Sequence, residues 1–355
     1  MSQGLDRRRL LAGGLLALTA AGAARAAAPK PPLVFDALGE IRTVYTPELV
    51  DQILASGTRA IAVTVTDPKV AAAEAYAQTN ADLDLYDRYL DSMPRHYIRA
   101  RRIADAERAA REGKLAVYYN LQNSTPVEGD AARLPALKAR GVTSIQLTYN
   151  DTNLSGSGCY APQDVGLTAH GRELIARLEA EGVLLDLSHA GMKTMAEAIA
   201  AARRPMIISH TACKDLRDHA RNTTDANLRA VAAKGGVIGI TQIRRFVTDL
   251  KRDNLGFYFD HIVHAVKVAG IEHVGIGSDR DHRVIPDTEE ELRILLKEEG
   301  PQLSAADWPM YLEGLNGPHR MTVVRDELRK RGFRPSELDK LLGANVRRIY
   351  AEVVG

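Results

Sequence analysis

The stretch LLDLSHAGMKTMAEAIAAARRPMIISH, residues 184–210, contains the pattern that decides the fold. It begins and ends with short, nearly continuous apolar runs, Leu184–His189 and Met206–His210. Between them, Lys193–Ala202 has apolar residues at helical spacing. Such runs are typical of strands buried on both faces, as in a parallel sheet. The stretch therefore predicts a strand, a helix and a second strand parallel to the first.

The same alternation continues along the chain in both directions. Further strands are predicted at Leu33–Ala37, Arg59–Val65, Leu115–Gln122, Ser144–Asn150, Val237–Ile243 and Val274–Asp281. Further helices are predicted at Asp130–Arg140, Thr168–Glu181, Asp225–Lys234 and Phe257–Ala269. Several helices end at a glycine, the residue that most easily adopts the left-handed cap conformation. Eight strands alternating with helices predict an α/β fold, a single-domain (β/α)₈ TIM barrel over residues 27–355, with a doubly wound open sheet as the alternative.

The first residues have the composition of an export signal. Arg7–Arg9 precede a short apolar run, Leu10–Leu18, and an A-x-A cleavage site lies at Ala24–Ala26. The arginines indicate the twin-arginine route, so residues 1–26 predict a signal peptide and a periplasmic location. The apolar run is shorter than the roughly 20 residues that span a bilayer. We expect no stable membrane span after cleavage, although an uncleaved signal would remain as an anchor.

Composition limits the classes of partner. The chain has 355 residues, 47 of them basic and 45 acidic, for a formal net charge of +2. Nucleic-acid binding needs a clustered basic surface, and this balance gives no reason to expect it. Cys159 and Cys213 are the only cysteines, and their spacing leaves a disulfide open but does not resemble a thiolate metal site. The sequence leaves a homo-oligomer open.

Polar residues end several of the predicted strands, where a barrel places its catalytic groups. These residues are Asp36, Gln122, Tyr149, His189, His210 and Asp279. Two histidines at the ends of successive strands predict a pair of metal ligands, because neutral imidazole is the commonest metal ligand in proteins. The alternative is that each histidine only hydrogen-bonds a neighbour. Asp279 is a candidate general base or further ligand, or else the partner of a nearby arginine.

An ordered series of motifs resembles one enzyme family. The blocks are Gln146–Asn150, Gly156–Cys159, Gly166–Thr168, Asp186–His189, Ile208–His210, Arg221–Asn222, Gly235–Gly239, Gly277–Asp281 and Leu342–Tyr350. Together they resemble the membrane-type (renal-type) dipeptidases of the amidohydrolase superfamily over nearly the whole chain from Leu33. The resemblance implies a TIM barrel with two bridged zinc ions and hydrolysis of small peptides that have a free C-terminal carboxylate.

The resemblance also assigns roles to individual residues. His189 and His210 match the two histidine ligands of one zinc ion, and Asp279 matches the catalytic acid/base. Arg221 matches the arginine that holds the substrate carboxylate, a role suited to the planar guanidinium fork. Tyr149 or Asn150 lies where the family polarises the scissile carbonyl.

Two departures from the family pattern affect the metal site. The family's His-x-Asp pair on the first strand corresponds to Leu38 and Glu40, and its bridging glutamate corresponds to Gln122. Two dications about 3.5–4 Å apart repel by about 17–19 kcal/mol at an effective dielectric of about 20. With a neutral residue in the bridging position, one zinc ion is expected rather than two. His189 and His210 would hold it, with water and Asp279, Gln122 or Glu40 completing its coordination.

Three functional hypotheses follow. The first is a metal-dependent dipeptidase. The second, motivated by Leu38 and Gln122, is a non-hydrolytic barrel-fold binding protein. The third is a periplasmic tailoring enzyme that acts on a peptide-derived metabolite. The amount of metal bound per chain separates the first two.

Overall fold

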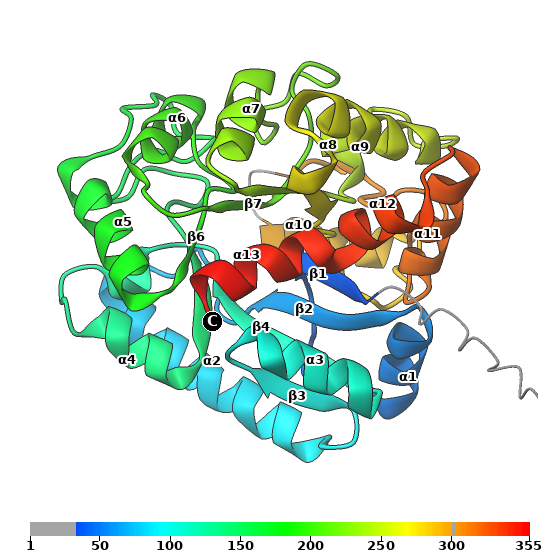
Figure 1. Ribbon diagram of the computed structural model, residues 1–355, viewed down its shortest axis with the longest axis horizontal. Helices are drawn as coiled ribbons and strands as arrows, with labels where there is room; N and C mark the ends of the chain where they lie inside the picture. The colour runs from blue at the N-terminus through cyan, green and yellow to red at the C-terminus, as the bar shows by residue number, and fades with distance from the viewer. Residues whose placement is uncertain (1–32, 300–302) are drawn as a thin grey trace, which may run out of the picture. The chain divides into compact units, whose positions relative to one another are not determined.

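A nine-stranded parallel sheet forms the centre of the fold (Figure 1). The computed structural model describes residues 33–299 and 303–355, which belong to one compact unit. Eight strands follow one another in the order β1-β2-β4-β5-β6-β7-β8-β9, and β3 pairs only with β4. The strands are β1 (Val34–Gly39), β2 (Thr58–Thr64), β3 (Tyr97–Ala100), β4 (Leu115–Leu121), β5 (Val142–Gln146), β6 (Leu184–Asp186), β7 (Ile207–Thr211), β8 (Val237–Ile240) and β9 (Val274–Ile276).

The ring of strands is nearly closed between β1 and the segment that follows β9. The backbone N–H of Asp279 donates to the carbonyl of Leu38 at 2.9 Å, and that of Glu40 donates to the carbonyl of Arg280 at 3.2 Å. Below these bonds, the buried Asp36 carboxylate accepts from the backbone N–H and the hydroxyl of Ser278, at 2.8 and 2.6 Å. The predicted TIM barrel is confirmed.

Helices lie between successive strands and after β9, and most of them cover the outside of the barrel (Figure 1). They are α1 (Pro47–Ala55), α2 (Ala72–Ser92), α3 (Ile103–Glu112), α4 (Arg133–Arg140), α5 (Ala169–Glu181), α6 (Met192–Ala201), α7 (Asp225–Ala233), α8 (Arg244–Val247), α9 (Leu255–Ala269), α10 (Glu289–Glu299), α11 (Arg320–Lys330), α12 (Pro335–Asp339) and α13 (Asn345–Val353). Helix α5 shows how the sequence sets such boundaries. The Thr168 hydroxyl accepts the Gly171 N–H at 3.0 Å at its start, and Gly182, at φ 65°, caps its end.

Helix α13 lies across one mouth of the barrel (Figure 1). Its Tyr350 ring packs against Phe35 of β1 and Tyr118 of β4, with ring centroids 4.9 Å apart in both pairs. These side chains belong to a buried cluster that joins α13 to residues on β6, β7 and β8. Because the amino-terminal ends of the strands are covered in this way, a functional site has to open at their carboxyl ends.

The observed strands differ from the predicted ones mainly at their carboxyl ends. Strand β5 ends at Gln146, β6 at Asp186 and β9 at Ile276, each several residues before the predicted end. The residues that follow, such as Leu147 and Leu187, are still fully buried, so the apolar run continues after the strand itself has ended. Strand β3 was not predicted, because its four residues form a short strand beside the main ring.

Two sequence-based expectations concern export and the cysteines. The predicted signal peptide, residues 1–26, lies outside the described residues. Within residues 33–299 and 303–355, no helix is both long and apolar enough to cross a membrane. Cys159 and Cys213 are both free, and burial raises the pKa of the Cys159 thiol to about 11.

Removing the Asp36 carboxylate is expected to destabilise the barrel strongly. Asp36 Oδ2 lies 3.7 Å from Arg320 Nη2, and both side chains are fully buried. Asp36→Ala leaves this guanidinium without its anion, a change that costs about 3–5 kcal/mol when a buried pair is broken. Urea unfolding at pH 7 measures the loss. Asp326→Ala, which removes a solvent-exposed partner of Arg329, should change stability by less than about 1 kcal/mol. Equal effects of the two variants would refute a special role for Asp36.

Candidate active site

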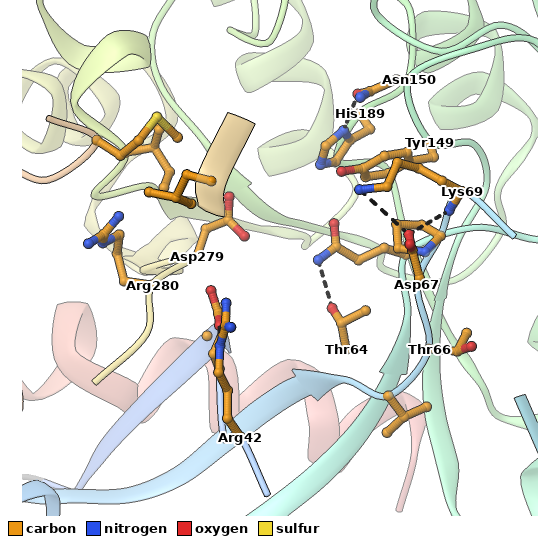
Figure 2. A pocket seen from close by; sticks show the side chains of 18 of the residues that line it. Arg42, Thr64, Thr66, Asp67, Lys69, Tyr149, Asn150, His189, Asp279 and Arg280 are labelled. Carbon is orange, nitrogen blue, oxygen red and sulfur yellow. Dashed lines mark hydrogen bonds and ion pairs between the residues drawn. The ribbon is translucent and has the colours of Figure 1, made fainter. Parts of the chain in front are cut away.

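A cavity of about 640 Å³ opens at the carboxyl ends of the strands, lined by the segments that follow them (Figure 2). Several predicted site residues line this cavity, among them Glu40, Gln122, Tyr149, Asn150 and His189. Arg221 and Asp279 line it as well, and His210 lies beneath it, fully buried. The rest of the wall includes Arg42, Thr64, Asp67, Lys69, Tyr160, Ile243, Arg245, Phe246, Arg280, Arg283 and Met310.

His189 is held on both sides of its ring. It follows β6 and has a left-handed backbone conformation, φ 64°, which is uncommon for a residue other than glycine. Its Nδ1 lies 2.8 Å from Oδ1 of Asn150, and its ring stacks on Tyr149 with centroids 4.3 Å apart. Because the amide oxygen can only accept, Nδ1 carries the proton and Nε2 presents its lone pair toward His210.

His210 lies within β7 and is positioned by a buried polar network. Its Nδ1 is 2.8 Å from the Ser209 hydroxyl, and its backbone N–H donates to the Ser188 hydroxyl at 3.0 Å. The Asp186 carboxylate in turn accepts the backbone N–H groups of Ser188 and Ser209, both at 3.0 Å. Burial raises the pKa of Asp186. The network orients the imidazole from below and fixes the part of β7 that carries it.

The two imidazoles meet at the floor of the cavity. Their Nε2 atoms are 3.0 Å apart. Burial, together with the charge of Arg221, holds the pKa of both rings well below the ordinary value, so both are neutral near pH 7. A proton on His210 Nε2 would be donated to His189. A proton on His210 Nδ1 would instead be donated to Ser209, which leaves two facing lone pairs that a cation can bridge.

Asp279 completes the centre of the site. It follows β9 with φ 54°, and its Oδ2 lies 3.9 Å from Nε2 of His210. About a quarter of its side chain is exposed, so the carboxylate can be reached from the cavity. The structure therefore brings together the three side chains His189, His210 and Asp279, which are far apart in the sequence.

Arg221 forms part of the cavity wall beside the histidines. Its Nη2 donates to the carbonyl of His210 at 3.2 Å, and its guanidinium lies over the Phe246 ring at 5.3 Å. The side chain is only 3% exposed. The cavity can thus present a desolvated guanidinium to a carboxylate close to the imidazole pair.

The other predicted site residues have partners of their own. The Gln122 amide donates to the Thr64 hydroxyl at 2.7 Å, and the Glu40 carboxylate accepts from Arg42 at 2.6 Å (Figure 2 shows Arg42 and Thr64). Leu38 is buried. The side-chain oxygen of Asn150 is hydrogen-bonded to Nδ1 of His189. Among the described residues, no group of three His, Cys, Asp or Glu side chains is arranged to hold a metal ion.

Three residues of the site were not singled out by sequence analysis. Asp186 accepts the backbone N–H groups of Ser188 and Ser209, which directly precede the two histidines. A carboxylate within an apolar predicted strand was the signal that could have revealed it. Arg280 directly follows Asp279, and Arg245 lies on α8. The structure places both arginines on the cavity wall, a position that no sequence pattern predicted.

The fold and this arrangement define an amidohydrolase-like barrel with a histidine pair at its carboxyl mouth. The sequence matches the membrane dipeptidase family (Peptidase family M19) over residues 43–292, and the chain belongs to that family.

Two curated relatives are named dipeptidases. The chain is 28% identical over 271 residues to Dipeptidase verJ of Clonostachys rogersoniana, a match that covers 76% of this chain and 62% of the relative. It is 35% identical over 175 residues to uncharacterized dipeptidase C965.12 of Schizosaccharomyces pombe, which covers 48% and 42%. The chain therefore spans less than two thirds of the length of either relative.

A solved structure shows the same fold over nearly the whole chain. An amidohydrolase from Pseudomonas aeruginosa superposes with a TM-score of 0.81 at 26% sequence identity. The superposition covers 91% of this chain and 96% of that protein.

Proposed function

We propose that this protein is a metal-dependent dipeptidase that acts on dipeptides with a free C-terminal carboxylate and uses one zinc ion. The observation that carries the proposal is the pair of neutral imidazoles, His189 and His210, with Nε2 atoms 3.0 Å apart and the Asp279 carboxylate 3.9 Å from one of them. Family membership and the dipeptidase relatives support the reaction class.

The histidine pair fits a single ion. Two imidazole nitrogens that each lie about 2.0–2.1 Å from zinc are about 3.3 Å apart in a tetrahedral site. The separation of 3.0 Å between the two Nε2 atoms is close to this value. His189 and His210 would therefore hold the metal. Catalytic zinc sites have three protein ligands and keep the fourth position open for water or substrate. The two histidines would supply two ligands, and Asp279, whose Oδ2 lies 3.9 Å from His210 Nε2, is the nearby side chain that could supply the third.

The chain's own residues supply the remaining functions of a hydrolase. A divalent ion at the pair would polarise the scissile carbonyl and lower the pKa of a water molecule. Asp279 accepts the proton of the attacking water and delivers it to the leaving nitrogen, which balances the hydrolysis of the amide. Arg221 holds the terminal carboxylate by two charge-assisted bonds. Tyr149 and Asn150 keep the His189 ring in place.

Elemental analysis tests the metal assignment. The protein without residues 1–26, purified and dialysed against zinc, is expected to retain about one equivalent per chain and to hydrolyse members of a dipeptide panel. Treatment with a chelator should abolish the hydrolysis, and added zinc should restore it. Two equivalents would show that the charge argument against a second ion is wrong. No turnover with zinc, manganese or cobalt would exclude the dipeptidase.

A second candidate is a non-hydrolytic binding protein with the same barrel. It is favoured by the positions of Leu38, which is buried, and Gln122, whose amide is bonded to Thr64. This candidate predicts that no metal is retained, while dipeptides still bind through Arg221. The metal analysis described above separates the two candidates in one sample.

A further inference from the structure

Six cationic side chains of the described residues line the cavity, and four of them are paired with carboxylates. The six are Arg42, Lys69, Arg221, Arg245, Arg280 and Arg283. The four pairs are Arg42–Glu40 at 2.6 Å, Lys69–Asp67 at 3.7 Å, Arg245–Asp307 at 3.9 Å and Arg283–Asp281 at 2.6 Å. Among the described residues, Arg221 and Arg280 have no carboxylate at ion-pair distance.

Arg280 is the less expected of these two cations. Its side chain is only 7% exposed, and its buried Nη2 has no hydrogen-bond partner among the described residues. Burial is the main influence on its pKa, which is lowered. The carboxylates of Glu40, Asp281 and Asp279 act on it from beyond ion-pair distance and raise it. Glu40 is already bonded to Arg42 and Asp281 to Arg283, and Oδ2 of Asp279 lies 3.9 Å from Nε2 of His210.

A buried guanidinium without an anion is unfavourable by itself. Removing an ion from water carries a penalty of several kcal/mol unless an opposite charge and hydrogen bonds offset it. A residue in the wall of a binding cavity can obtain the opposite charge and the hydrogen bonds from a bound ligand. The proposed function assigns such a ligand group, the terminal carboxylate, to Arg221. Arg280 lies on the opposite side of Asp279 from His189 in Figure 2, so an anion bound there would be a different group of the substrate.

We propose that Arg280 binds a second carboxylate, and that the preferred substrates are dipeptides with an aspartate or glutamate side chain. The planar fork of Arg280 would meet that side chain while Arg221 holds the terminal carboxylate. This inference rests on the proposed function for the identity of the first carboxylate. It deepens that function by naming the substrate class.

Matched substrates test the preference. Glu-Ala differs from Gln-Ala, and Ala-Glu from Ala-Gln, by the charge of one side chain at nearly constant size. In the wild type, kcat/KM is expected to be about 10- to 100-fold higher for the acidic member of at least one pair, the range of a hydrogen bond to a charged group. Arg280→Met should reduce that ratio to near one, and Arg280→Lys should leave an intermediate value.

Arg283→Met is the control. Arg283 also lines the cavity, but it is paired with Asp281, so its loss should leave the acidic-to-neutral ratio as in the wild type. A wild-type ratio below about three in both substrate pairs overturns the proposal. So does a high ratio that persists in Arg280→Met.

Thermal unfolding distinguishes a binding role from a structural one. Since Arg280→Met removes an unpaired buried charge, Tm should stay the same or rise. If Arg280 only stabilises the fold, Arg280→Met should instead lower Tm and leave the acidic-to-neutral ratio of kcat/KM unchanged. That combination overturns the proposal.

Binding to the metal-free protein separates this inference from the proposed function. Calorimetry of the chelator-treated wild type should show that an acidic dipeptide binds at least tenfold more tightly than its neutral counterpart, and that Arg280→Met abolishes the difference. Equal affinities overturn the role of Arg280 even if dipeptides are hydrolysed. A clear preference without hydrolysis in the metal-loaded protein supports Arg280 while the proposed function fails.

Discussion

Replacing His210 by alanine is expected to remove the metal and to lower kcat/KM for dipeptides by about 10³-fold or more, the equivalent of the several kcal/mol that a Lewis acid supplies. His210 is fully buried and contributes one of the two facing Nε2 atoms. Without it, His189 alone remains at the floor of the cavity. Metal content by elemental analysis and initial rates on the best dipeptide measure the two effects.

Two further variants make this result specific. His210→Asn keeps an amide that can bond the Ser209 hydroxyl but lacks Nε2, so it should fold and still lose the metal. His96→Ala removes a histidine that pairs with Asp51 away from the cavity, and it should retain both metal and activity. A His210→Asn protein with full metal content and activity would remove the histidine pair from the mechanism.

Asp279→Asn is expected to lower kcat by about 10²- to 10⁴-fold, the usual contribution of a general acid/base. Asparagine has the same shape, and it tolerates the left-handed backbone that Asp279 adopts at φ 54°. The change therefore removes the charge and the proton-accepting oxygen with little strain. Because the metal would be held by the two histidines, the metal content should stay at the wild-type value.

Asp67→Asn provides the matched comparison. Asp67 also lines the cavity, but its carboxylate is mostly exposed and lies 3.7 Å from Lys69 (Figure 2). We expect the kcat of Asp67→Asn to remain within about threefold of the wild type, since an exposed ion pair contributes little free energy. Asp279 would lose its assigned role if the two variants had similar kcat values.

Both histidines of the proposed site are positioned by neighbouring side chains. His189 is fixed by Asn150 and Tyr149, and His210 is fixed by Ser209 and Ser188. The residues directly before the two histidines, Ser188 and Ser209, both donate their backbone N–H groups to the Asp186 carboxylate. Such supporting hydrogen bonds select the tautomer and the direction of a metal-binding imidazole, which is why they matter as much as the ligands themselves.

Much of this protein could be predicted from local sequence patterns. Buried apolar runs alternating with helical spacing predicted all eight strands of the main ring, because strands covered on both faces carry few polar residues. The polar residues at the ends of those runs led to His189, His210 and Asp279. The family resemblance added Arg221, which the structure places on the cavity wall.

Other features depended on contacts between residues far apart in the chain. The strand ends could not be located from the sequence, since burial continues past the last paired residue of β5, β6 and β9. The covering of one mouth by α13 follows from the packing of Tyr350 against Phe35 and Tyr118. Neither is visible in a local pattern.

The sequence by itself determined the barrel, the family and the pair of histidines, because each depends on residue type at a regular spacing. Only the tertiary structure decided which cavity cations are paired and which are not. Three of the four pairs join residues two positions apart in the chain, whereas Arg245 and Asp307 are 62 residues apart. The pairing of Arg245 and the unpartnered Nη2 of Arg280 among the described residues therefore depend on how the chain folds. Long-range packing, rather than any motif, therefore leaves Arg280 on the cavity wall without a carboxylate at ion-pair distance among the described residues.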